Sequence, residues 1–192
     1  MTKTSIILRV ATVTIMASSI SFIGTLRAQD TGIGSNPHLR SMSAPTTTPG
    51  AVVKMSQKDV NFIQKAAGGG QQEVENGKMA ERQAKSAEVK NIAARMVSDH
   101  TRINSELTAL AKRKGVTFNT SGVKAQNLGS ADFDRTYLKL LEETHKTDIA
   151  DFERAAKGAN DSELKAWAAK TLPTLKQHLA LVEAAEGKMK MR

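Results

Sequence analysis

Residues 89–110 read VKNIAARMVSDHTRINSELTAL, and this stretch decides the fold class. Its apolar residues return every three or four positions, a spacing that places them on one face of an α-helix. That face carries Val89, Ala93, Met96, Ile103, Leu107 and Leu110. One polar residue, His100, stands in the middle of the same face. The stretch therefore predicts a long amphipathic helix that buries a histidine.

Three further segments have the same helical period. We expect the four helices at residues 56–84, 86–114, 131–157 and 161–187. Short links join the first helix to the second and the third to the fourth, which favours antiparallel neighbours. The prediction is an all-α protein, an antiparallel up-down-up-down four-helix bundle. The first helix must accommodate several glycines, which we expect to let a neighbouring helix approach closely: Gly68, Gly69, Gly70 and Gly77.

Each predicted helix carries one ionisable residue within its apolar face. These residues are Glu73, His100, His145 and His178. Counted from the helix ends at a rise of ~1.5 Å per residue, they lie within about two turns of one level. Histidine and carboxylate side chains gathered in a helical core are common ligands of metal ions. We therefore predict a site for one transition-metal ion at these four residues, with zinc, copper, iron or nickel as suitable metals.

Three further carboxylates flank this predicted site. Glu142 stands three residues before His145, and a Glu-x-x-His motif on one helix can supply an extra ligand to the same ion. Asp99 and Asp148 flank the site and could orient imidazole rings, but solvated positions on the flank of a helix explain both better.

Two other interpretations of the polar positions remain open. A Glu–His hydrogen-bond network without metal fits the same pattern, in a structural or interaction module of the cell envelope. A haem-binding bundle would use His178 or His100 together with a methionine such as Met96 as axial ligands. The chain has no nucleophilic serine motif, phosphate-binding loop or dinucleotide fingerprint. The sequence therefore favours a non-enzymatic role.

The beginning of the chain has the pattern of a secretory signal. Lys3 and Arg9 supply positive charge, residues 6–26 are mostly apolar, and Leu26-Arg27-Ala28 is a tolerable cleavage site before Gln29. The following segment is rich in Gly, Ser, Thr and Pro and contains His38. We divide the chain into a signal peptide (1–28), a flexible linker (29–55), a four-helix bundle domain (56–186) and a frayed basic tail (187–192).

The composition of the chain restricts where in the cell the protein works and what it binds. The 192 residues include no cysteine, which excludes disulfides, thiolate metal ligands and a lipid-carrying cysteine. No segment after the signal approaches the ~20 apolar residues that a membrane span needs. The formal charge is +9 and falls by three with the signal peptide, so an anionic envelope surface is a suitable partner. Export separates the protein from nucleic acid, and we expect it to be periplasmic or secreted.

Four segments resemble one known family. They are FIQKAAGGGQQEVENGKMA (62–80), VKNIAARMVSDHTRINSEL (89–107), FDRTYLKLLEETHKTDIADFE (133–153) and ELKAWAAKTLPTLKQHL (163–179). Together they are similar to the exported domain-of-unknown-function family 4142, whose members are often labelled predicted outer-membrane proteins. The resemblance covers roughly residues 56–186.

This resemblance implies a ferritin-like four-helix fold and a bacterial envelope setting. It also implies that Glu73, the Asp99–His100 pair, His145 and His178 are recurrent polar positions of the family. A ferritin-like di-iron centre needs Glu-x-x-His on two helices, and only Glu142–His145 fits that pattern here. This departure from the di-iron pattern favours a single histidine-rich site, and such a site fits a role in metal handling or envelope stress protection.

Overall fold

The structure is a computed structural model that describes residues 54–191. It contains four α-helices and, within those residues, no strand: α1 (Gln57–Gln83), α2 (Ala87–Arg113), α3 (Phe133–Gly158) and α4 (Ser162–Lys190). The predicted all-α four-helix bundle is confirmed. The predicted signal peptide and nearly all of the predicted linker, His38 included, lie outside the described residues. None of the four helices has a stretch apolar enough to span a bilayer.

Hydroxyl and carboxylate side chains begin three of the helices. Ser56 accepts a hydrogen bond from the backbone N–H of Asp59, and Ser86 accepts one from Glu88. Asp161 accepts one from Leu164 at 2.9 Å, which caps the start of α4. Such caps satisfy backbone donors that the first turn of a helix leaves free. Helix α4 continues to Lys190, beyond the expected end near residue 187.

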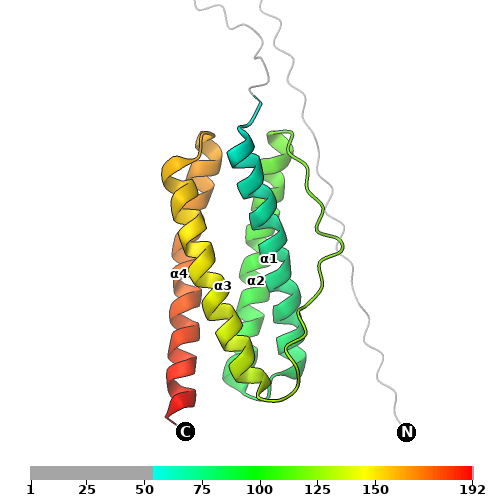
Figure 1. Cartoon of the computed structure of the whole chain (residues 1–192), viewed down its shortest axis with the longest axis vertical. Helices are drawn as coiled ribbons and strands as arrows, with labels where there is room; N and C mark the ends of the chain where they lie inside the picture. The colour runs from blue at the N-terminus through cyan, green and yellow to red at the C-terminus, as the bar shows by residue number, and fades with distance from the viewer. Residues whose placement is uncertain (1–53, 192) are drawn as a thin grey trace, which may run out of the picture. The chain divides into compact units, whose positions relative to one another are not determined.

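The directions of the helices differ from the predicted up-down-up-down order. At one end of the bundle Lys58 of α1 donates to the carbonyl of Gly158, and Lys114 lies 2.8 Å from Asp161. At the other end the backbone N–H of Ser86 donates to Asp134 at 2.7 Å. Helices α2 and α3 therefore run in the same direction. The connection between them, residues 114–132, crosses the length of the bundle beside α1 (Figure 1). One long crossover of this kind is typical of ferritin-like bundles.

The bundle consists of two helical hairpins, α1–α2 and α3–α4. Helices within a hairpin pack more extensively than helices of different hairpins, which meet along the α1/α3 and α2/α4 seams. Two apolar clusters fill the interior, one around Ile63, Leu107 and Trp167 and the other around Met96 and Leu138. A layer of polar residues separates the two clusters, and this layer holds the candidate site.

Candidate metal centre

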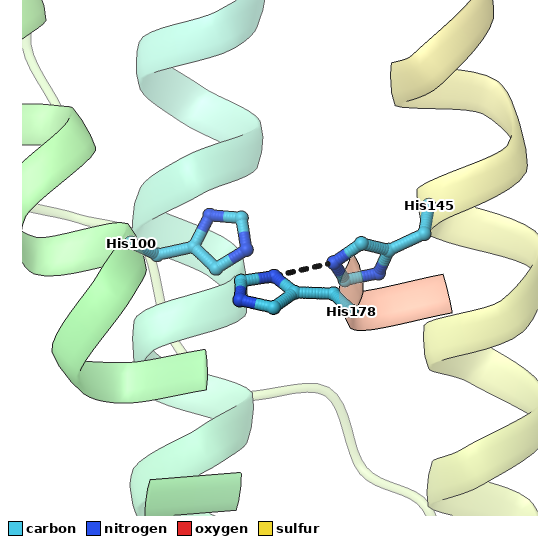
Figure 2. A group of neighbouring side chains, drawn as sticks. All are labelled: His100, His145 and His178. Carbon is cyan, nitrogen blue, oxygen red and sulfur yellow. Dashed lines mark hydrogen bonds between the residues drawn. The ribbon is translucent and has the colours of Figure 1, made fainter. Parts of the chain in front are cut away.

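Each helix contributes one side chain to the polar layer. Glu73 comes from α1, His100 from α2, His145 from α3 and His178 from α4, and all four are at most 2% exposed. The centroids of the three imidazole rings lie 5.2 to 5.6 Å apart. One ring nitrogen of each histidine lies within 4.8 Å of the others, and the rings turn toward one another (Figure 2). The predicted convergence of the three histidines is confirmed as geometry.

His145 and His178 form the closest pair of rings. Nε2 of His145 lies 3.1 Å from Nδ1 of His178 (Figure 2). The opposite nitrogen of each ring faces an acceptor: Nδ1 of His145 lies 2.9 Å from the carbonyl oxygen of Leu141, and Nε2 of His178 lies 2.9 Å from a carboxylate oxygen of Asp99. A neutral imidazole has only one N–H. The tautomers in which both rings donate outward leave two unprotonated nitrogens facing each other across 3.1 Å, whereas any other neutral arrangement puts a hydrogen bond between the rings and gives up an outward one.

A facing pair of lone pairs needs a positive centre beside it. A proton would make one ring an imidazolium ion, which is costly in a buried setting. A metal ion would use both lone pairs, and ligating histidines characteristically donate their second N–H to a carboxylate or a backbone carbonyl. Leu141 and Asp99 supply those two acceptor types. The orientation of the rings thus fits metal ligation.

His100 completes the set of nitrogens. Its Nε2 is buried and has no hydrogen-bond partner, while its Nδ1 lies 3.0 Å from Oε2 of Glu73. That distance is within hydrogen-bond range, but the ring N–H is poorly aligned with the oxygen, so it marks proximity only. Figure 2 shows the His100 ring directed at the facing nitrogens of His145 and His178. A buried nitrogen without a partner is available as a third ligand.

Glu73 lies behind the rings and not among the converging nitrogens. Its two oxygens lie 3.0 Å from Nδ1 of His100 and 3.4 Å from Nδ1 of His145, on the side of each ring opposite Nε2. Both oxygens are buried and neither accepts a hydrogen bond. Burial raises the pKa of Glu73 well above its usual value, and the nearby charge of Asp148 raises it further. Its position suits an orienting carboxylate better than the direct ligand that we predicted.

Burial acts on the histidines in the opposite direction. It lowers the pKa of His100 well below the ordinary value, helped by the two neighbouring rings, and lowers the pKa of His145 to about 4. The pKa of His178 is also lowered by burial, although its hydrogen bond to Asp99 opposes this. All three rings are therefore neutral at pH 7, the state in which imidazole binds metals.

The remaining predicted participants lie in different places. Asp99 contacts His178, and Arg95 and Arg102 of its own helix flank its carboxylate at 3.4 and 3.9 Å. The structure does not bring Glu142 into the cluster, because its side chain turns to the surface and pairs with Lys146. Burial raises the pKa of Asp148 to about 6.

The haem interpretation does not suit this geometry. A porphyrin needs a slot between its two axial ligands, and a His100–Met96 pair on the buried face of one helix leaves no such slot. Met96 lies one turn from His100 on the same helix and is buried in an apolar cluster.

Sequence reasoning did not identify the hydroxyl of Tyr137, which is buried without a partner two turns before His145. No sequence signal distinguishes that hydroxyl from a ring that only packs.

Comparison with models of known protein families identifies the family of this chain. The model of the family described as "Domain of unknown function (DUF4142)" matches residues 44–185, and the chain belongs to this family. No curated protein matches the chain.

Two solved structures are similar to the fold. A DUF305 fragment from Deinococcus radiodurans is 16% identical with a TM-score of 0.60, covering 70% of this chain and 98% of that fragment. A conserved hypothetical protein from Mycobacterium tuberculosis is 11% identical with a TM-score of 0.59, covering 68% of this chain and 91% of its own. At these identities the likeness concerns the fold alone, which is a ferritin-like helical bundle.

Proposed function

We propose that this DUF4142 protein binds one transition-metal ion through Nε2 of His100, Nε2 of His145 and Nδ1 of His178. One observation carries the proposal: Nε2 of His145 and Nδ1 of His178 lie 3.1 Å apart, while the opposite nitrogen of each ring lies 2.9 Å from an oxygen acceptor. Three imidazoles suit zinc, copper, iron and nickel. The remaining coordination position is left for water or another small ligand.

The distances support a site that tightens around its ion. Metal–nitrogen bonds of about 2.0 to 2.1 Å in tetrahedral geometry place ligand nitrogens about 3.3 Å apart. The His145–His178 pair already has a separation of this size, at 3.1 Å. The full set spans up to 4.8 Å, so His100 moves inward by roughly 1 Å or more when the ion binds. Glu73 and Asp99 would then hold the ring N–H groups of His100 and His178.

The role that suits this site is metal handling in the bacterial envelope, including protection under metal stress. The three rings are at most 2% exposed, so they are placed to hold an ion and poorly placed to meet an organic substrate. The signal pattern of residues 1–28 supports export to the periplasm or beyond. Export is tested separately, by N-terminal sequencing of envelope fractions. A processed chain that begins at Gln29 is expected, and an unprocessed chain in the cytoplasm would contradict it.

Metal binding is tested with the mature full-length protein. We expect one equivalent of Zn²⁺, Cu²⁺ or Ni²⁺ by elemental analysis and calorimetric titration, and none in a His100→Ala, His178→Ala double variant. The His38→Ala variant is the matched control, because it removes the one histidine outside the cluster. An ion at 100 times its dissociation constant should stabilise the folded protein by about 2.7 kcal/mol. Equal binding by the double variant and by the control would refute the proposal.

A metal-free polar core is the second candidate, and the 3.1 Å nitrogen separation also fits a hydrogen bond between two rings. It requires one ring to give up its outward N–H or to carry a proton in the core. Heating the protein with and without each ion distinguishes the two. A melting temperature that no ion shifts favours the structural module.

A further inference from the structure

The seam between α1 and α3 leads from the surface to the candidate site. Contacts along it join Lys58 to Gly158 (2.7 Å), the ring of Phe62 to that of Phe152 (5.2 Å between centroids) and Lys65 to Asp151 (2.6 Å). The two helices are antiparallel, so each step forward on α1 pairs with a step backward on α3. Continuing this register places Gly69 opposite Asp148. One turn further, Oε1 of Glu73 lies 3.4 Å from Nδ1 of His145.

Gly69 leaves open space at this level of the seam. A Cβ atom added to Gly69 would have no neighbour within 4 Å, whereas one added to Gly70 or Gly77 would collide with α2. Close helix approach therefore explains Gly70 and Gly77 but not Gly69. Glycine in the middle of a helix costs about 0.5 to 1 kcal/mol relative to alanine. By the helical register, the open space at Gly69 lies at the level of Asp148, one turn before Glu73.

Carboxylates mark successive turns of the same seam. A hollow of about 280 Å³ lies at its outer end, lined by Phe62, Lys65 and Asp151 among others. Asp148 lies one turn further in, half-buried, and Glu73 lies at the inner end with both oxygens buried and unpartnered. The register of the seam therefore places Lys65, Asp148 and Glu73 at successive levels, between the Lys65–Asp151 pair and the Glu73–His145 contact. A row of oxygen donors therefore runs from the surface hollow to the histidines.

We propose that the α1/α3 seam is the route by which a divalent cation reaches the three histidines, with Asp148 as the intermediate oxygen donor and Glu73 as the last one. This inference rests on the proposed metal site. Lys65 stands at the outer hollow and is paired with Asp151, so an arriving cation displaces the ammonium group from that carboxylate. Gly69 keeps the passage open because it has no side chain.

The test is stopped-flow uptake of Co²⁺ by the mature full-length protein, followed by the absorption of the bound ion. Gly69→Leu should slow both uptake and release by about tenfold or more, because it closes the passage and leaves the ligands intact. Gly68→Leu is the matched control, since Gly68 also has open space but turns away from α3, on the face whose neighbours Gln64 and Gln72 contact the 114–132 connection. Uptake by Gly69→Leu at the rate of Gly68→Leu would overturn the route.

A second variant keeps the test decisive if Gly69→Leu does not fold. Asp148→Asn removes the intermediate charge with little change in shape, and we expect uptake to slow by about tenfold, the lower limit of electrostatic focusing. An unchanged uptake rate in Asp148→Asn would then overturn the route. Failure of the metal site itself looks different, because the wild-type protein would take up no Co²⁺ at all.

Discussion

Replacing Glu73 with glutamine should stabilise the metal-free protein and weaken metal binding. Glu73 is 2% exposed, and both of its oxygens lack a hydrogen-bond partner. A buried polar group without a partner costs about 1 to 3 kcal/mol, and more when it is charged. Glutamine has the same shape and carries no charge at any pH. The metal-free Glu73→Gln variant should therefore exceed the wild type in unfolding free energy by about 1 to 3 kcal/mol at pH 8.

The pH dependence of this difference has a definite sign. The pKa of Glu73 is raised in the folded protein, so between its usual pKa and the folded pKa the folded state retains a proton that the unfolded state has lost. Stability then falls as the pH rises through this range. The advantage of the variant should be small at pH 5 and should grow toward pH 8.

Metal should favour the wild type over the variant by about 1.3 to 2.3 kcal/mol, which offsets much of the variant's advantage. An ion at 100 times the wild-type dissociation constant contributes about 2.7 kcal/mol to the wild type. Loss of an orienting carboxylate weakens metal binding about 10- to 100-fold, so the same ion concentration gives the variant only about 0.4 to 1.4 kcal/mol.

Urea unfolding at pH 5 and pH 8, with a chelator and with Zn²⁺, measures all of these terms. Glu75→Gln is the matched control, because Glu75 lies two residues away and its carboxylate contacts Gln71 and Lys78 at the surface. We expect no pH-dependent gain in that control. A Glu73→Gln protein that is less stable than the wild type at pH 8 without metal, or equally stabilised by Zn²⁺, would refute the reasoning.

Three further predictions concern the same layer and its helices. Burial lowers the pKa of His145 from 6.5 to about 4, so acidification from pH 7 to pH 4 should remove about 3 kcal/mol of stability, a loss that a His145→Leu variant lacks in urea unfolding. Asp99→Asn should raise the Zn²⁺ dissociation constant about 10- to 100-fold by calorimetry while the melting temperature of the metal-free protein stays nearly constant. Gly77→Ala should destabilise the protein by about 1 to 3 kcal/mol because its Cβ would lie 2.7 Å from Val97, whereas Gly68→Ala should stabilise it by about 0.5 to 1 kcal/mol.

The apolar period of the sequence was sufficient to predict the four helices and the inward direction of the histidines. The apolar period was insufficient to predict the directions of the helices, because the length of the 114–132 connection allows either a local turn or a crossing of the bundle. The site survived that error for a geometric reason. His100 and His145 lie near the middle of α2 and α3, so reversing a helix leaves them at nearly the same height.

Other features depend on side-chain orientation, which a periodic pattern does not contain. Helical spacing alone leaves Glu142 close enough to join an ion shared with His145, yet its side chain reaches Lys146 in solvent instead. The same spacing placed Glu73 inside the bundle but could not predict which nitrogen of each ring it faces. Ring orientation is set by partners such as the carbonyl of Leu141. Every residue has a backbone carbonyl, so the sequence does not indicate which one a ring contacts.

The position of the site across the two hairpins links metal binding to the assembly of the bundle. His100 and Glu73 belong to the α1–α2 hairpin, while His145 and His178 belong to α3–α4. Contacts between hairpins are less extensive than contacts within them, and the polar layer interrupts the apolar core where the hairpins meet. An ion bound by all three histidines would join the two hairpins at this polar layer. The free energy of binding is then also free energy of hairpin docking, because an ion that binds only the docked state stabilises that state.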